Sequence, residues 1–366
     1  MRVCGKEDIL MQTESGKNAA TAHMKSSFER IKRACEEKEY SMMNFNIWEW
    51  WSGVGLYGLV AASENLACPE YDGFLAEWFD KNSASKQTGS VNRVIPCCVP
   101  EYLYKKTGKK IYKDFCDEYA DWCLTKAIFA ENGGFAHVWG PDAKGKEMGS
   151  PEYRHQVWAD SVMMACVFMI RYGVDTDDDL LIKAALKQIS IHIEALFDEN
   201  SGLFYHAYDC LKNERLGCFW GRGNGWIAAS LAIVLKYVDR GRYDLSHLAD
   251  VFVRFMKRVY EYRAENGFLH TLINRRDSYT ESTASMLFGY AAGVGYELGL
   301  LDGKFRDWTL QIADGLEFEE NGAVKYASGG TNPEPSPEVY MNIPYMESAY
   351  SFGLVLMLLS ELSKCC

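Results

Sequence analysis

The 366-residue sequence lacks the cysteine spacings of common zinc and redox sites, although it contains twelve cysteines. No C-x-x-C occurs, the cysteines are scattered, and adjacent pairs such as Cys97 and Cys98 are poor candidates for disulfides. The first 25 residues are polar and lack the apolar segment of a secretion signal. We therefore expect reduced thiols that act mainly as small hydrophobic residues, in a cytoplasmic protein.

Basic clusters and long apolar runs are absent as well. The chain has 39 basic and 50 acidic residues, so its formal charge is 39 − 50 = −11. Nucleic acids and anionic membranes are bound by basic surfaces, which argues against either partner. No apolar run approaches the roughly 18–20 residues of a membrane span, so we expect no membrane association.

Several sequence signatures of metal and nucleophile chemistry are also missing. Neither H-E-x-x-H nor G-x-S-x-G occurs, and no cluster has metal-ligand spacing. The acidic run at residues 175–179 lacks the glycine and the glutamate that a calcium loop needs at its sixth and twelfth positions. We therefore expect no metal ion.

The residues that are present predict a helical protein rich in aromatic side chains. Ten Trp, 22 Tyr and 18 Phe can line a large cavity or fill the core. Apolar residues recur with helical spacing along most of the chain, and strand-like alternation is confined to the connections. Helices are predicted near residues 27–39, 53–66, 71–82, 91–107, 111–130, 157–172, 177–197, 225–239, 243–263, 280–298, 303–318 and 346–364.

An internal repeat follows four of the long helices. A Glu-Asn-Gly-like turn followed by apolar residues recurs with glycines 68, 65 and 55 residues apart, at Gly134, Gly202, Gly267 and Gly322. Repeats of about 60 residues accommodate two helices and a loop, and 366/6 = 61. The chain therefore predicts an all-α (α/α)6 barrel of six helical hairpins. We expect one catalytic domain at residues 27–366, preceded by a polar extension at residues 1–26.

Asp160 is the strongest candidate for chemistry. It is the only charged residue between Val157 and Ile170, in a segment that is apolar on all sides and therefore buried. A buried carboxyl has a raised pKa, as a proton donor at neutral pH requires. The alternative is that Asp160 only caps the helix or makes a buried hydrogen bond.

A second candidate is the glycine-rich segment from Trp220 to Trp226. A glycine-rich loop that opens a helix offers free N–H groups to an anion, and Arg222 adds a fork for a carboxylate. The two tryptophans provide flat apolar faces of the kind that sugar rings prefer. A tight turn with packing tryptophans is the structural alternative. His137 and His206 end two of the repeated turns, so we expect them to line the same opening.

Together these motifs resemble the unsaturated rhamnogalacturonyl hydrolases, glycoside hydrolase family 105, which are close to the unsaturated glucuronyl hydrolases of family 88. The motifs follow the family order over roughly residues 45 to 362. They are Trp50 to Val54, Gln156 to Asp160, Gly202 to His206, Trp220 to Trp226 and Glu281 to Ser285.

The resemblance implies an (α/α)6 barrel without metal or cofactor and an unusual hydrolysis. Polysaccharide lyases leave a 4,5-unsaturated uronic acid at the non-reducing end, and the family hydrates this double bond. An acid protonates C4, water adds at C5, and the resulting hemiketal rearranges and releases the neighbouring sugar. This differs from the two-carboxylate scheme of ordinary glycosidases.

The family's site residues can be placed on this sequence by their motifs. Asp160 matches the catalytic Asp. Trp220, Arg222, Trp226, His206 and His137 match substrate-contacting positions, with Arg222 facing the uronate. Asn92 stands where many relatives carry a second Asp. An amide can form hydrogen bonds with substrate or water but cannot titrate.

The resemblance implies a small anionic oligosaccharide as substrate, galacturonyl or glucuronyl. Two alternatives remain open at this stage. An (α/α)6 sugar epimerase or isomerase could use the two histidines, and an inactive sugar-binding relative would explain the amide in place of the acid. We expect a monomer or a homodimer.

Overall fold

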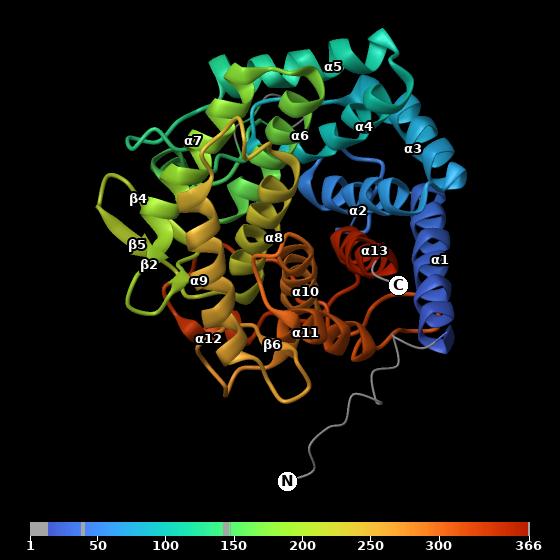
Figure 1. Cartoon of the computed structure of the whole chain (residues 1–366). Helices are drawn as coiled ribbons and strands as arrows, with labels where there is room; N and C mark the ends of the chain where they lie inside the picture. Colours follow the sequence, from blue (N-terminus) through green and yellow to red (C-terminus); the bar gives the residue numbers. More distant parts are fainter. Residues whose placement is uncertain (1–13, 38–40, 142–145, 147, 365–366) are drawn as a thin grey trace.

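The computed structural model describes residues 14–37, 41–141, 146 and 148–364. Helices alternate between an inner and an outer layer of a closed ring (Figure 1). The outer helices, which bury one face only, are α1 (Glu14–Glu36), α3 (Pro69–Asn82), α5 (Lys110–Asp121), α7 (Asp179–Leu196), α9 (Ser246–Tyr262) and α11 (Gly303–Asp314). The inner helices are α2 (Trp50–Leu66), α4 (Cys98–Thr107), α6 (Val167–Thr176), α8 (Gly221–Tyr237), α10 (Ser282–Glu297) and α13 (Ala349–Lys364). This is the predicted arrangement of six helical pairs.

The burial pattern follows from the sequence of each layer. The inner helix α8 is buried from Gly221 to Leu235, because every face of it contacts other helices. The outer helix α9 buries only a stripe of apolar residues and exposes its charged side. The core therefore occupies the centre of the ring and the layer between the two sets of helices.

The ring closes where the first inner helix meets the last. A Cβ atom at Gly58 of α2 would lie 2.1 Å from the carbonyl oxygen of Gly353 of α13. A Cβ at Gly353 would lie 2.3 Å from the carbonyl oxygen of Val54. These two glycines let the helix backbones touch, so the seam is sealed without a side chain between them.

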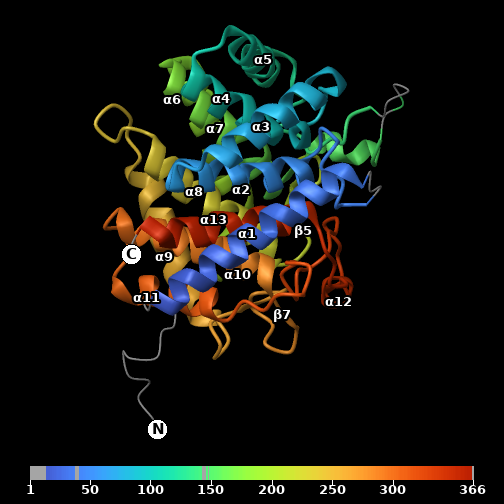
Figure 2. The same cartoon turned by 90° about the vertical axis from the view of Figure 1, so that its right-hand side faces the viewer.

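Short strands and turns connect the helices. β1 (Gln156–Trp158), β4 (Ala207–Asp209) and β5 (Glu214–Leu216) form an antiparallel sheet in the order β1-β4-β5, in which Trp158 pairs with Ala207. Two further antiparallel pairs join β2 (Phe197–Asp198) to β3 (Leu203–Phe204) and β6 (Leu269–His270) to β7 (Thr280–Glu281). Figure 2 shows that β5, β7 and the short helix α12 (Pro337–Met341) lie at the same end of the ring, away from the C-terminal end of α13. The inner helices begin at this end.

Several predicted helix boundaries need correction. α1 begins at Glu14 and buries Ala20 and Met24, so residues 14–26 of the expected polar extension form part of the helical layer. The rest of that extension, residues 1–13, lies outside the described residues, as does the end of the predicted helix 27–39. The predicted helix 157–172 begins as strand β1, because its first residues pair with β4.

The remaining interruptions are short helical turns of other types. Pro96 has no backbone N–H, and the predicted helix 91–107 therefore starts with two 3₁₀ turns before α4. Among the described residues, the non-α turns are Ser83–Ser85, Val91–Arg93, Ile95–Cys97 and Pro151–His155 in 3₁₀ conformation, and Trp122–Lys126 and Val162–Cys166 in π conformation.

The repeated turns have a common geometry, with one change to the predicted alignment. Asn132, Asn266 and Asn321 each accept a hydrogen bond from the backbone N–H two residues later. In the first copy Gly133 takes the left-handed conformation, with φ +81°, and Gly134 does not. The glycine of the first copy that is equivalent to Gly202, Gly267 and Gly322 is therefore Gly133, one residue before the predicted Gly134.

The nine cysteines in the described part of the chain are unpaired. No helix among the described residues is long and apolar enough to cross a membrane. Within the same ranges, no group of His, Cys, Asp and Glu side chains is arranged to hold a metal ion.

Candidate active site

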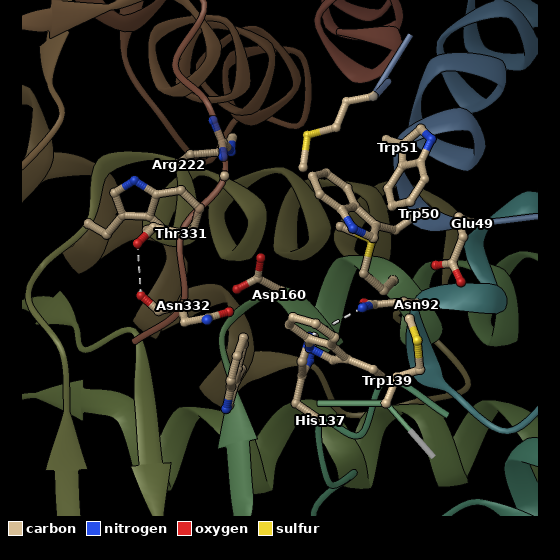
Figure 3. Close-up of a pocket in the computed structure, with 16 residues that line it drawn as sticks. Glu49, Trp50, Trp51, Asn92, His137, Trp139, Asp160, Arg222, Thr331 and Asn332 are labelled. Carbon is tan, nitrogen blue, oxygen red and sulfur yellow. Dashed lines mark hydrogen bonds between the residues drawn. The ribbon is translucent and has the colours of Figure 1, made fainter. Parts of the chain in front are cut away.

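A cavity of about 420 Å³ opens at the end of the ring where the inner helices begin. Its walls combine aromatic and methionine side chains with a few polar groups (Figure 3). The lining residues are Met42, Glu49, Trp50, Trp51, Asn92, His137, Trp139, Met148, Trp158, Asp160, Met164, Trp220, Arg222, Gly330, Thr331 and Asn332. Such a mixture is typical of a site for a small, partly apolar ligand.

Asp160 lies near the middle of this cavity, between Arg222 and His137 in Figure 3. The pairing of β1 with β4 brings Asp160 to the cavity at the point where the chain turns into its inner helix. The side chain is 18% exposed, and Oδ2 is buried without a hydrogen-bond partner among the described residues. Nε2 of His206 lies 3.4 Å from that oxygen.

The charge state of Asp160 differs from the prediction. Burial raises its pKa, but the neighbouring His206, His137 and Arg222 outweigh burial, so the pKa lies below its ordinary value. The expected rise is therefore wrong for the protein without substrate. At neutral pH the free site holds a carboxylate rather than a carboxylic acid.

His137 and Asn92 form a hydrogen-bonded pair beside Asp160. The amide nitrogen of Asn92 lies 3.4 Å from Nε2 of His137, and Nδ1 of His137 lies 3.1 Å from Oγ of Ser161. An amide nitrogen only donates, so Nε2 is the acceptor and Nδ1 carries the hydrogen. Burial lowers the pKa of His137 to about 4, and the ring, stacked on Trp158 at 4.1 Å, is neutral at pH 7.

Arg222 is buried at the start of α8, and two backbone carbonyls occupy one edge of its guanidinium. Nη1 donates to the oxygen of Ser328 at 2.6 Å, and Nη2 donates to the oxygen of Gly329 at 2.7 Å. The rings of Trp220 and Tyr350 lie 4.5 and 4.9 Å from its central carbon. Nε is buried without a partner in the described part of the chain, and Arg222 is one of the residues that line the cavity.

The glycines around Arg222 have a different role from the predicted one. Gly221, Gly223 and Gly225 lie inside the first turns of α8 and do not form a loop before it. A Cβ at Gly221 would lie 2.6 Å from the carbonyl oxygen of His270, and one at Gly225 would lie 2.9 Å from Leu287. These glycines therefore let α8 pack closely against its neighbours.

The remaining predicted residues are divided between the cavity and the core. Trp220 lines the cavity, but Trp226 is fully buried in the core and does not. Six residues along an α-helix correspond to about 600°, which places Trp226 on another face of α8. Its prediction as a substrate-contacting side chain is therefore wrong. His206 lies behind the cavity wall, where it contacts Asp160 and packs on Trp220 at 4.6 Å.

Several cavity residues were not predicted as site residues. Glu49 and Trp51 stand at the start of α2, while Trp139, Thr331 and Asn332 come from connecting loops. Glu49 accepts a hydrogen bond from Nε of Arg93 at 2.8 Å, and burial raises its pKa. The three tryptophans within residues 48–51 could have indicated this part of the site from the sequence. No sequence pattern marks the loop residues as part of it.

Comparisons with known proteins show which family the chain resembles. The sequence profile described as Glycosyl Hydrolase Family 88 matches residues 23–366. The chain belongs to glycosyl hydrolase family 88. As a family 88 member it is a glycoside hydrolase that acts on an oligosaccharide, and the suspected relationship is confirmed.

Individual relatives agree with this assignment. The chain is 30% identical to the unsaturated rhamnogalacturonyl hydrolase YesR of Bacillus subtilis, over 87% of this chain and 90% of that protein. A protein from Salmonella enterica described as a possible member of family 105 superimposes with a TM-score of 0.86 at 20% identity, covering 96% of this chain and 95% of that one. An unsaturated glucuronyl hydrolase specific for heparin gives a TM-score of 0.71 at 13% identity, covering 94% and 97%. These two structures support the fold.

Proposed function

We propose that this family 88 member removes a 4,5-unsaturated uronic acid from the non-reducing end of lyase-generated oligosaccharides, with Asp160 as the catalytic acid. One observation carries the proposal. The mostly buried carboxyl group of Asp160 and the guanidinium of Arg222, whose Nε has no partner among the described residues, belong to residues that line the same cavity. An anionic sugar that also requires a proton can use both groups.

The substrate carboxylate is the natural partner for the open edge of Arg222. A buried guanidinium binds a carboxylate through charge-assisted hydrogen bonds, and the ring of Trp220 lies 4.5 Å from the central carbon of the Arg222 guanidinium. The inner helices α2 and α8 also begin at the cavity, and the N-terminal end of a helix favours an anion. This local arrangement offsets the net charge of −11 of the protein.

The proton is then delivered by Asp160. Protonation at C4 of the enol ether leaves positive charge at C5, and water adds there while the carboxylate of Asp160 accepts a proton from it. The hemiketal at C5 opens, and the neighbouring sugar is released. One water is consumed, and Asp160 returns to its starting protonation state. Asn92 and His137 lie beside this carboxylate and can orient the water or the sugar hydroxyls.

The test follows the conjugated double bond directly. An unsaturated galacturonyl-rhamnose disaccharide made by a lyase is mixed with the protein, and the ultraviolet absorbance of the double bond is recorded. We expect the absorbance to disappear, and Asp160→Asn to slow its loss by about 10²–10⁴-fold without altering the unfolding curve. Undiminished turnover in that variant would remove Asp160 from the mechanism, and release of an isomer of unchanged mass would support the epimerase alternative.

The finer assignments also belong to this proposal. A galacturonyl substrate is favoured by the similarity to YesR, whose name specifies a rhamnogalacturonyl substrate. A cytoplasmic location agrees with the unpaired cysteines of the described chain. The monomeric or dimeric state stays a prediction, to be measured by light scattering.

A further inference from the structure

Tyr340 is linked to the candidate acid Asp160 through His206, which lies between them. It lies on α12, is fully buried, and places its hydroxyl 2.8 Å from Nδ1 of His206. The other ring nitrogen of His206 faces Oδ2 of Asp160 at 3.4 Å. The three side chains form a row from the segment that covers the cavity to the carboxylate inside it.

The direction of the first hydrogen bond can be assigned. The oxygen of Tyr340 accepts the backbone N–H of Glu334 at 3.1 Å, and the backbone amide of Cys218 acts on the same oxygen. Its own hydrogen needs an acceptor, and Nδ1 of His206 is the one that the described residues provide. Tyr340 is therefore the donor, and Nδ1 of His206 is the acceptor.

This assignment determines where His206 carries its hydrogen. A neutral imidazole that accepts at Nδ1 has its hydrogen on Nε2. Oδ2 of Asp160 lies 3.4 Å from this nitrogen, and the two atoms do not form a hydrogen bond in the free protein. The distance of 3.4 Å is long for a hydrogen bond, but such contacts commonly shorten when substrate binds.

We infer that Tyr340 is a positioning residue that fixes the tautomer of His206, so that Nε2–H holds Oδ2 of Asp160 and leaves Oδ1 to exchange the proton with substrate. The inference rests on the proposed function of Asp160. It assigns a role in the reaction to a residue outside the cavity wall.

Tyr340→Phe removes the hydroxyl and keeps the ring that packs on Trp220. We expect kcat to fall about 10–100-fold with KM changed less than about threefold, because the substrate contacts remain. Tyr279→Phe is the matched control, because its hydroxyl bonds Ile343 and Ser328 in the same covering segment but does not touch His206.

A role in packing alone predicts equal behaviour of the two variants, and an unchanged kcat in Tyr340→Phe would overturn the inference. A second measurement needs no change at Tyr340. ¹⁵N NMR of histidine-labelled parent protein, with the His206 signals assigned by their loss in His206→Gln, reports which nitrogen is protonated. Hydrogen on Nε2 supports the inference, and hydrogen on Nδ1 refutes it. Because this readout needs no turnover, it is independent of whether the parent hydrolyses the unsaturated disaccharide.

Discussion

Binding of a carboxylate in the cavity should change the protonation state of Asp160. The pKa of this group lies below its ordinary value in the free protein, so Asp160 is ionised at neutral pH. The proposed reaction begins with a protonated Asp160. The proton must therefore be taken up when the substrate binds, and the substrate's own negative charge provides the driving force.

The required energy agrees with the expected electrostatics. Raising the pKa of an ordinary Asp carboxyl to 7 takes about 4 kcal/mol. Two like charges about 4 Å apart, at an effective dielectric constant of about 20, repel each other by about 4 kcal/mol. Pairing of Arg222 with the substrate would also weaken one of the interactions that hold the pKa of Asp160 down. The approach of one carboxylate and the weakened interaction with Arg222 therefore both move the pKa of Asp160 up toward 7.

Calorimetry measures this proton uptake. A saturated galacturonyl-rhamnose disaccharide carries the carboxylate but no reactive double bond, so it binds without turnover. Titrations at pH 7 in buffers of different ionisation enthalpy should show uptake of about one proton per bound ligand. Asp160→Asn should bind the same ligand with almost no proton uptake.

The uncharged methyl ester of the disaccharide is the control ligand, because it fills the cavity without adding charge. It should bind without proton uptake in either protein. Equal uptake by the parent and Asp160→Asn would show that another group takes the proton. Binding by the parent without any uptake would refute the electrostatic reasoning and leave Asp160 without a source for its proton.

Three other predictions concern stability and substrate capture. Gly58→Ala should lower the free energy of unfolding in urea by about 3 kcal/mol or more through its clash with Gly353, whereas Gly73→Ala, which meets no neighbour, should raise it by about 0.5–1 kcal/mol. Burial lowers the pKa of His192 to about 4, so the unfolded chain takes up a proton before the folded one as the pH falls from 6.5 toward 4, and the free energy of unfolding decreases. Between pH 7 and pH 5 this decrease should be about 2 kcal/mol smaller in His192→Asn than in the parent. Arg222→Lys loses its carbonyl hydrogen bonds, and it should lower the free energy of unfolding by about 1–3 kcal/mol and raise KM at least tenfold; an unchanged KM would place the uronate elsewhere.

The ring of helices could be predicted because helix periodicity and the repeated turns are local signals. The predicted segments correspond to the observed helices, and the errors lie where tertiary contacts decide the backbone. The strand at Gln156–Trp158 forms only because β4 lies beside it, more than 45 residues later in the sequence. The early start of α1 depends on a buried stripe that includes Ala20 and Met24, among many polar residues.

The candidate site was only partly predictable for a similar reason. Asp160 was visible as one charge in an apolar segment, and its position in the cavity agrees with that signal. Its pKa was not predictable, because the lowering comes from His206, His137 and Arg222 on other segments. Trp226 was predicted to contact substrate because it belongs to the same motif as Trp220 and Arg222. A motif on a helix contains residues from several faces of that helix, and the face that carries Trp226 packs in the core and not against the cavity.

The amide at Asn92, where the resemblance led us to expect a second acid, is compatible with an active site built around a single proton donor. Asn92 presents an N–H group to Nε2 of His137, and that contact suits a neutral imidazole. A carboxylate in the same place would face a ring nitrogen without a hydrogen and would favour a protonated His137 instead. A charged His137 would then hold Asp160 more firmly in its ionised form. Asn92 and the low pKa of His137 therefore support each other, and this arrangement agrees with the proposal that Asp160 is the group that exchanges a proton with substrate.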